Sequence, residues 1–423
     1  MTPLPSPSPR RPRLRYAAIV GAVIAGSGLL GGAPLGAAPT QETAAQETAA
    51  QDTPTQETGT GTTVRVAVFN VWELSLTKLD EVDPEGRGAH PQLLAAAEIL
   101  QRVRPDIVLI NEIDYDPERD AVRRFQDRYL AVPQGGQDPI RYPHVVYEPV
   151  NTGVPSGLDL SGDGDADDPE DAWGFGRYPG QYGMAVLSRF ETDSEALRTF
   201  QMLRWSSLPG HLMPDGREGR PAWYGPEAAD RLRLSSKSHW DVSVRIGGRI
   251  LHILAAHPTP PVFDGDEDRN GRRNFDEIRL WGDYLTGGDA ASWIVDDRGR
   301  RGGLSSGAPF VILGDYNADP VRDSGPYGQP AIDQLLKHPR VRDPKPKGDG
   351  DQGEDRPYAG DSRTRTSAYG RIDYALPSRN LDVVGSGVFL PPAESPLRPL
   401  VAGDGRASDH QLVWVDLRWE TPR

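Results

Sequence analysis

The stretch Phe310-Val311-Ile312-Leu313-Gly314-Asp315-Tyr316-Asn317-Ala318-Asp319-Pro320 decides how the rest of the chain is interpreted. Its first four residues are apolar and two of them are β-branched, which predicts a buried strand. Polar side chains that a strand interior does not tolerate follow Gly314. Because Asp315 and Asn317 lie two residues apart, both point to one side if the extended backbone continues, and together they suit a site for a hard cation and a phosphate. The alternative is a strand followed by an Asx turn.

Polar residues also stand at the ends of several other predicted strands. With the two above, the set comprises Asn70, Glu112, His257, Asp315, Asn317, Asp373, Asp409 and His410. Each of these alone is more often a cap or turn residue. Together, carboxylates, carboxamides and two imidazoles are the groups that metal-assisted hydrolysis requires, because oxygen ligands hold Mg²⁺ or Mn²⁺ and a histidine activates or orients water.

Composition narrows the class of protein. The chain has no cysteine, which excludes disulfides, thiolate metal ligands and cysteine nucleophiles. Its 47 glycines and 40 prolines favour an architecture rich in strands and loops. The net charge of −14 disfavours a protein that binds polyanions through a broad basic surface. It does not exclude an enzyme that engages a few phosphates through a metal.

Hydrophobic periodicity places secondary structure along the chain. Strands are expected at 64–71, 106–112, 144–147, 183–189, 240–246, 249–256, 310–313, 372–376, 381–388 and 411–418. Helices are expected at 91–103, 118–129, 274–286 and 330–337, and Gly247-Gly248 is typical of a two-residue hairpin turn. Many strands with few, scattered helices predict an α/β fold with two β-sheets packed face to face and helices outside.

The N-terminal part of the chain differs in composition from the rest. Residues 1–38 combine an arginine-rich start, an apolar run and small residues ending at Ala38, which predicts an export signal. The alternative is an uncleaved membrane anchor, which the glycines and Pro34 disfavour. Residues 39–62 form a low-complexity linker that is expected to be disordered. We therefore expect a secreted or cell-envelope protein with no stable membrane span after processing and one large domain at 63–423.

Seven short motifs occur in order between residues 64 and 418. They are Phe69-Asn70-Val71, Asn111-Glu112, Gly183-Met-Ala-Val-Leu-Ser-Arg189, His257-Pro258, Gly314-Asp315-Tyr316-Asn317-Ala318-Asp319, Arg371-Ile372-Asp373-Tyr374 and Ser408-Asp409-His410. This ordered set resembles the endonuclease/exonuclease/phosphatase superfamily, and within it the pancreatic-type deoxyribonucleases. The resemblance implies a four-layer α/β sandwich, with two β-sheets flanked by helices, and metal-dependent hydrolysis of a phosphoester by a catalytic domain at 63–423.

The resemblance also implies a metal site. By position, Asn70 and Glu112 bind Mg²⁺ or Mn²⁺, and Asp409 is either a metal ligand or the partner of an imidazole. Abasic-site endonucleases, which belong to the same superfamily, carry an acid two residues after the strand-end asparagine. This chain has Trp72 at that position, so the resemblance to that specialised branch is weaker.

Five further residues receive catalytic roles from the resemblance. Asp315 orients or deprotonates the attacking water, and Asn317 contacts the phosphate. His410 touches the scissile phosphate as an acid or base. His257 matches the second histidine of the deoxyribonuclease-like branch, and Asp373 supports either His257 or the metal site.

One lysine and two acidic segments invite further interpretation. Lys237 offers a phosphate contact, although an exposed strand lysine is the favoured interpretation. Residues 266–277 and 159–170 fit the twelve-residue spacing of a calcium loop. The candidate Ca²⁺ ligands are Asp266, Asp268, Asn270 and Glu277 in the first segment and Asp159, Asp163 and Glu170 in the second. The alternative for both segments is a solvated acidic loop.

The resulting hypothesis is an exported phosphodiesterase of nuclease-like type, acting as a monomer. A nucleic acid, a phospholipid head group and a small phosphoester all remain open as substrate, so a phosphomonoesterase or a phospholipid phosphodiesterase is the alternative. A non-catalytic calcium-binding surface protein on the same scaffold is the hypothesis from another class. Specificity is expected to lie in the loops at 151–181, 205–236 and 343–366.

Overall fold

The computed structural model describes residues 61–118, 120–322, 328–351 and 358–420. The predicted export signal and the linker as far as residue 60 lie outside this part. Gly61 and Thr62, which the sequence assigned to the linker, instead begin the first strand and pair with Glu420 and Trp419. Within the described ranges, no helix has the length and apolar character needed to cross a membrane.

The first β-sheet has six strands in the order β11-β12-β1-β2-β4-β3. Its members are β1 (Gly61–Leu74), β2 (Ile107–Ile113), β3 (His144–Val146), β4 (Gly183–Ser188), β11 (Asp382–Val388) and β12 (Val413–Glu420). Strands β1 and β2 are parallel, whereas β1 and β12 are antiparallel. The first strand of the domain therefore lies in the interior of this sheet, next to the last one.

The second β-sheet has the order β10-β9-β8-β7-β5, with β6 also paired to β7. Its members are β5 (Glu191–Thr192), β6 (Arg198–Thr199), β7 (His239–Ile246), β8 (Arg249–Ala256), β9 (Phe310–Asp315) and β10 (Asp373–Pro377). Strands β8 and β9 are parallel. The predicted hairpin turn joins β7 to β8, and its two glycines have φ values of 54° and 81°, as a type I′ turn requires.

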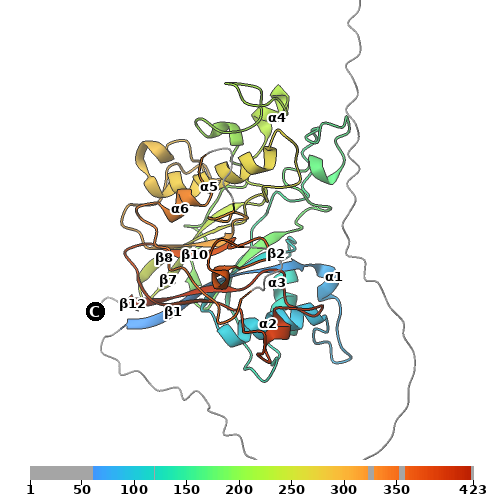
Figure 1. Ribbon diagram of the computed structural model, residues 1–423, viewed down its shortest axis with the longest axis vertical. Coiled ribbons are helices and arrows are strands. Elements are labelled where there is room, and N and C mark those ends of the chain that lie inside the picture. The colour runs from blue at the N-terminus through green and yellow to red at the C-terminus, as the bar shows by residue number, and fades with distance from the viewer. Residues whose placement is uncertain (1–60, 119, 323–327, 352–357, 421–423) are drawn as a thin grey trace, which may run out of the picture. The chain divides into compact units, whose positions relative to one another are not determined.

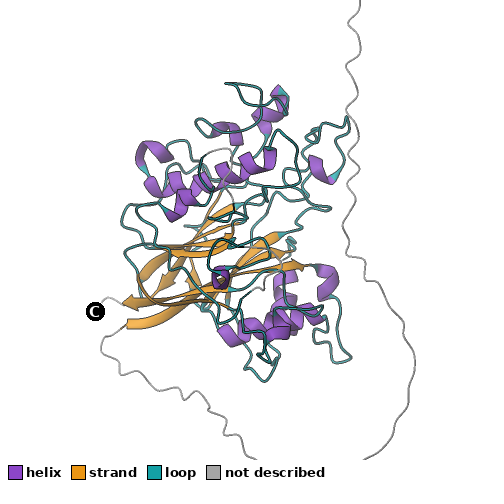
Figure 2. Ribbon diagram, viewed as in Figure 1, coloured by secondary structure: helices purple, strands orange, loops and turns teal. Residues whose placement is uncertain are grey.

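Helices cover the outer faces of both sheets (Figures 1 and 2). Next to the first sheet lie α1 (Leu76–Leu79), α2 (Pro91–Val103) and α3 (Asp120–Phe125), the last continued by a π-helical turn at Gln126–Leu130. On the side of the second sheet lie α4 (Pro226–Arg231), α5 (Arg269–Thr286) and α6 (Asp333–Leu336). This arrangement confirms the four-layer sandwich. Helix α2 has its predicted bounds, with proline at its first position, where the missing N–H costs nothing.

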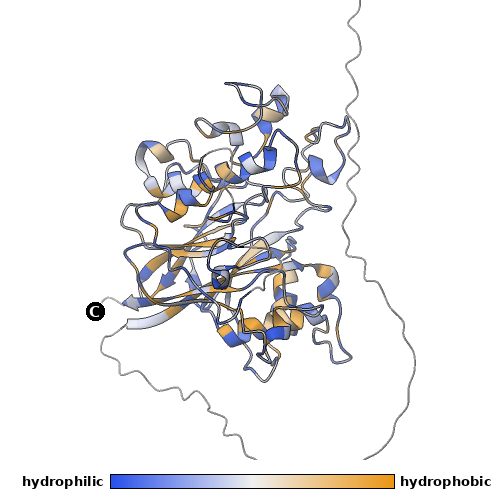
Figure 3. Ribbon diagram, in the orientation of Figure 1, coloured by the Kyte–Doolittle hydropathy of each residue, from blue (hydrophilic) through white to orange (hydrophobic). Residues whose placement is uncertain are grey.

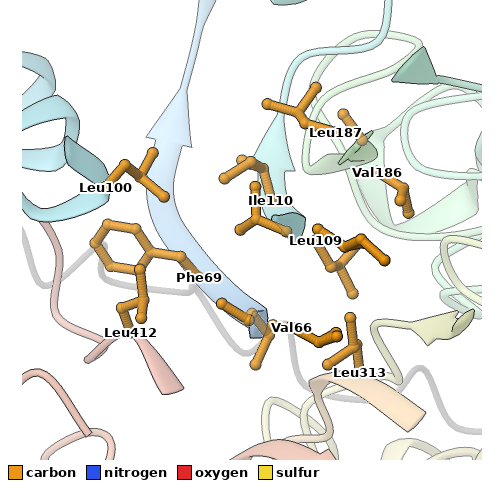
Figure 4. Packing of buried hydrophobic residues seen from close by; sticks show 14 of the residues in the cluster. Val66, Phe69, Leu100, Leu109, Ile110, Val186, Leu187, Leu313 and Leu412 are labelled. Carbon is orange, nitrogen blue, oxygen red and sulfur yellow. The ribbon is translucent and has the colours of Figure 1, made fainter. Parts of the chain in front are cut away.

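The two sheets bury apolar side chains against each other and against the helices. Strand β9 packs on both faces, because Val311 and Leu313 join the cluster between the sheets while Phe310 and Ile312 face α5. Figure 4 shows Leu313 beside residues of the first sheet, and Figure 3 shows hydrophobic residues along the central strands. This two-sided burial fixes the end of β9, where Asp315 lies.

Candidate active site

Strand register brings the polar residues of the two sheets to one place. In the first sheet, Asn70 of β1 lies opposite Asn111 of β2, and Glu112 follows. In the second sheet, Asp315 of β9 lies opposite Asp373 of β10. A hydrogen bond of 3.0 Å from the Asn70 amide to Asp315 Oδ2 joins the two sheets at these ends.

The Asp315 carboxylate lies at the centre of this cluster. It is 1% exposed. Besides the Asn70 amide, its Oδ2 atom has His257 Nε2 at 3.4 Å and His410 Nε2 at 3.7 Å. Its backbone N–H donates to Asn111 Oδ1 at 3.1 Å, so Asn111 holds the end of β9 from the other sheet. Asn111 stands in the same motif as Glu112 but is not among the predicted site residues.

The backbone after Asp315 forms a turn. Strand β9 ends at this residue, and Asn317 has a left-handed φ of 51°, so the expectation that the extended conformation continues is wrong. The N–H of Asn317 donates to Asp315 Oδ1 at 2.9 Å, which is the Asx turn of the alternative interpretation. The Asn317 amide then donates to the Pro258 carbonyl at 3.2 Å. One carboxylate oxygen therefore stabilises the turn while the other faces the imidazoles.

Asn70 and Glu112, the predicted metal ligands, are in contact. The Asn70 amide donates to Glu112 Oε1 at 3.0 Å, and Glu112 Oε2 accepts from the Glu73 N–H at 3.0 Å. Trp72, Glu73 and Glu112 all have positive φ, between 44° and 65°. Non-glycine residues adopt this conformation at a cost of roughly 1–3 kcal/mol each. Such strain at one point is typical of a functional site.

Asp373 and His410 form a buried pair. The Asp373 Oδ2 atom lies 2.8 Å from His410 Nδ1, and the Asp373 N–H donates to Thr366 Oγ1 at 3.0 Å. Asp373 therefore supports His410, and the expectation that it supports His257 is wrong. Asp315, Asp373 and His410 each place a possible ligand atom within 4.8 Å of the others, so a role for Asp373 at the metal site stays a prediction. Because Asp373 holds the ring, Asp409 is not the imidazole partner. The half-buried Asp409 instead accepts a weak hydrogen bond of 3.4 Å from Ser408, and its role as a metal ligand stays a prediction.

The environment sets different charges on these groups. Burial alone would raise the pKa of Asp315, but His410 and His257 lower it below its usual range. Burial opposes a charged His410, yet the carboxylates of Asp373 and Asp315 hold its pKa well above 6.5. Burial and Asp315 together raise the pKa of Asp373 to about 6, although His410 opposes this rise. Burial and the Lys237 charge lower the pKa of His257. The cluster thus holds an ionised Asp315 between one neutral and one charged imidazole.

Lys237 is not the exposed strand lysine that the sequence favoured. It precedes β7 and is 6% exposed. Its carbonyl accepts from the Asn151 N–H at 2.9 Å, and its charge acts on His257, whose pKa it lowers. Burial lowers its pKa, and the carboxylates of Glu277, Glu112 and Asp315 oppose that shift. Among the described residues, its ammonium has no hydrogen-bond partner, so it is available to an anion.

The calcium loop predicted at 266–277 is wrong. Helix α5 begins at Arg269, so Asn270 and Glu277, two of the predicted ligands, lie in one regular helix with no turn of a calcium loop between them. Glu277 is fully buried and accepts from the N–H groups of Ser236 and Thr259 at 2.7 and 2.6 Å. Asp266 and Asp268, the other predicted ligands, precede the helix.

The buried polar face of α5 positions the active-site loops instead. The amide of Asn274 donates to the carbonyls of Thr259 and Tyr316 at 2.8 and 2.9 Å. Asn274 and Glu277 are three residues apart, which is helical spacing, and that spacing was the signal in the sequence that could have revealed them. They hold the backbone next to His257 and Asn317.

The second predicted calcium loop has irregular backbone, but the acids that lie close together in it are not the three predicted ligands. Asp163, Asp168 and Asp171 each place a carboxylate oxygen within 4.8 Å of the others. Asp159 accepts hydrogen bonds from the N–H groups of Gly162 and Gly164, and neither Asp159 nor Glu170 belongs to this group. Of the three residues predicted there, only Asp163 is in the cluster.

Comparison with known proteins identifies the family. The model of the Endonuclease/Exonuclease/phosphatase family matches residues 67–410, whereas no curated protein matches. A solved endonuclease/exonuclease/phosphatase from Beutenbergia cavernae DSM 12333 is 19% identical over 84% of this chain and 72% of its own, with a TM-score of 0.45. Truncated Caenorhabditis elegans TDP2 is 15% identical over 84% and 97%, with a TM-score of 0.41. The human Nocturnin catalytic domain with bound sulfate is 14% identical over 85% and 94%, with a TM-score of 0.40. Because the family model spans most of the chain, the protein belongs to the endonuclease/exonuclease/phosphatase family of phosphoester hydrolases.

Proposed function

We propose that the protein is an exported, divalent-metal-dependent phosphodiesterase that cleaves its substrate by in-line attack of water. The observation that carries this proposal is the contact of one buried carboxylate, Asp315, with both imidazoles and with the amide of Asn70. Water attack on phosphorus requires a group that accepts a proton and a second group that protonates the leaving oxygen. The two imidazoles on either side of Asp315 differ in charge and suit these two tasks.

The donor set fits a hard divalent cation. Asn70 and Glu112 offer only oxygen ligands at this position, and Glu112 is partly exposed, which leaves access from solution. Oxygen-only sites of this kind favour Mg²⁺ or Mn²⁺. These two residues, with Asp409, would hold the ion, which supplies neutralisation of charge on the phosphate oxygens. The excess of carboxylates over imidazoles in the cluster supports this assignment.

The residues divide the remaining work. Asp315, which is ionised, orients the attacking water, and the neutral His257 accepts its proton. His410 is charged and protonates the leaving oxygen, while Asp373 fixes the ring through Nδ1 so that Nε2 faces the reacting group. The Lys237 ammonium, which has no hydrogen-bond partner in the described part of the chain, binds a phosphate oxygen.

A diester is the favoured substrate because His257 matches the second histidine of the deoxyribonuclease-like branch. Protonation of the leaving oxygen by His410 would serve a monoester equally. The nature of the esterified groups is left open by this chemistry. A nucleic acid, a phospholipid head group and a small diester would present the same phosphorus to the site. The net charge of −14 argues against tight binding of a long polyanion along the surface.

Hydrolysis of a bis-aryl phosphodiester beside an aryl phosphomonoester, in Mg²⁺, Mn²⁺ or EDTA, tests this proposal. We expect turnover of the diester with metal, none in EDTA and none with the isosteric Asp315→Asn variant. Turnover of the monoester alone would move the assignment to a phosphatase. Inactivity toward both, and toward DNA, RNA and phospholipids, would favour a non-catalytic protein.

Export is tested separately. A reporter fused after residue 38 should leave the cytoplasm, and deletion of residues 16–30, the apolar run, should retain it. Retention of the intact fusion would overturn the export part of the proposal without affecting the enzymatic part.

A further inference from the structure

The loop between β3 and β4 concentrates negative charge far along the chain from the catalytic motifs. Residues 159–171 contain seven acids and no lysine or arginine. Three of the acids, Asp163, Asp168 and Asp171, each have a carboxylate oxygen within 4.8 Å of the other two. No ion pair among the described residues involves any of the three. Like charges at this spacing repel each other, and a bound cation would offset that repulsion.

A bound cation would stabilise Asp171 most, because this residue is buried. Asp171 is 1% exposed. The Oδ1 atom accepts from the N–H groups of Leu160 and Ser161 at 2.7 and 2.9 Å. The Oδ2 atom is shielded from solvent and has no hydrogen-bond partner among the described residues. An ionised oxygen in that condition is costly unless it binds a cation.

We propose that Asp163, Asp168 and Asp171 bind one Ca²⁺ ion, at a site distinct from the catalytic centre. All three ligands are hard oxygens, which excludes a preference for softer metals such as Zn²⁺ or Cu⁺. Asp163 and Asp168 lie on irregular, partly exposed backbone, where water can complete the coordination. Ca²⁺ accepts such flexible, partly hydrated sites, whereas Mg²⁺ demands a nearly ideal octahedron. This inference does not depend on the proposed catalytic activity.

The ion would connect the exposed tip of the loop to its buried base. The Leu160 carbonyl accepts from Trp223 Nε1 at 2.9 Å. The carbonyl of Trp173, two residues after Asp171, accepts from the Arg273 guanidinium of α5 at 2.7 Å. Asp171 therefore sits on backbone that is anchored to the helical layer. Binding would hold Asp163 and Asp168 against this anchor, and the bound loop should resist unfolding and proteolysis.

The base of the same loop reaches the catalytic region. The N–H of Asn151 donates to the Lys237 carbonyl at 2.9 Å, and the Asn151 amide donates to the Ser235 carbonyl at 2.8 Å. The site therefore belongs to the loop that supports Lys237 from outside. Its three ligands make no contact with the catalytic cluster, so their removal should leave the chemical step intact.

The test uses the full chain with Glu112→Gln, which removes a proposed catalytic metal ligand. Calorimetric titration with Ca²⁺ should show one bound ion per chain. Thermal unfolding should shift upward by about 2–4 °C in saturating Ca²⁺ and by less in Mg²⁺. In the same background, Asp163→Asn with Asp168→Asn should abolish both effects. These substitutions keep the side-chain oxygens that accept from the N–H groups of Asp165 and Glu170.

Two comparisons make the result decisive. Asp165→Asn with Asp167→Asn removes the same two charges from the same loop, outside the trio, and should retain Ca²⁺ binding. Because Asp171→Asn risks misfolding, the more exposed Asp163 and Asp168 carry the test. Absence of Ca²⁺ binding in the Glu112→Gln chain, or an equal upward shift after Asp163 and Asp168 are both replaced, would overturn the proposal.

Discussion

Asp315 and Asp171 are both 1% exposed, yet their surroundings shift them in opposite directions. Around Asp315, burial alone would raise the carboxyl pKa, but the two imidazoles and the N–H of Asn317 lower it. Around Asp171, burial and the neighbouring acids Asp168 and Asp159 raise it, against two backbone N–H donors. The difference teaches that a buried acid acquires its role from the charge around it. Where the protein supplies the positive charge, the acid stays ionised for chemistry, and where it does not, a cation from solution completes the site.

The largest effect on catalysis is expected when Asp315, the carboxylate between the two imidazoles, is replaced. Asp315→Asn keeps the side-chain shape but removes the ionised oxygen between the imidazoles. We expect kcat to fall by about 10²- to 10⁴-fold, because water loses the group that orients it. Steady-state kinetics on the diester, with circular dichroism to verify folding, would check this. Near-normal turnover by the folded variant would remove Asp315 from the mechanism.

A smaller effect on catalysis is expected when Asp373, which helps to keep His410 charged, is replaced. Asp373→Asn removes one of the two carboxylates that raise the pKa of His410. Because His410 acts while protonated, activity is lost as pH rises through its pKa, and lowering that pKa moves the alkaline limb of the kcat profile toward lower pH. We also expect kcat to fall by about 10- to 100-fold. An alkaline limb that moves to higher pH would contradict the assigned pair.

The next effect concerns binding rather than chemistry. Lys237→Met removes the ammonium, which has no hydrogen-bond partner among the described residues, with little change in volume. If this group binds a phosphate oxygen, KM should rise roughly tenfold while kcat changes less, and Lys237→Arg should restore part of the affinity. A fall in kcat at constant KM would instead place Lys237 in the chemical step.

The smallest effect on catalysis is expected when acids of the proposed Ca²⁺ site are replaced. Asp163→Asn with Asp168→Asn, in an otherwise unchanged chain, should alter kcat on the diester by less than about twofold, because these residues do not touch the catalytic cluster. The same protein should unfold at a lower temperature than the parent chain in Ca²⁺. A tenfold loss of kcat would show that the acidic loop and the catalytic cluster are coupled, so that Asp315 and Asp171 do not act independently.

The sequence alone predicted the strand-end residues of the site well. Buried strands such as β9 leave a clear apolar signal, and the polar residue that ends each strand stands out against it. Antiparallel pairing of β9 and β10 then brings Asp315 and Asp373 together, and packing of the two sheets brings Asn70 to Asp315. The partner of His410 did not follow, because Asp409 is its neighbour in the sequence whereas Asp373, which makes the hydrogen bond, lies 37 residues away.

Other parts of the site depend on tertiary contacts that no local pattern reports. The spacing of oxygens before Glu277 fits a calcium loop and a helix face equally, and packing against Ser236 and Thr259 decides for the helix. Asp171 lies one position beyond the twelve-residue template and was missed. Lys237 appeared exposed because its burial comes from distant segments of the chain.

The pairing of β1 with β12 has a consequence for the order of folding. Arg65 and Asp416, 351 positions apart in the chain, form an ion pair of 2.7 Å between these strands. The interior strand of the first sheet therefore lacks one neighbour until the C-terminal strand is available. Such distant pairing is slow to form. Formation of this pair is therefore expected to limit how fast the first sheet is completed.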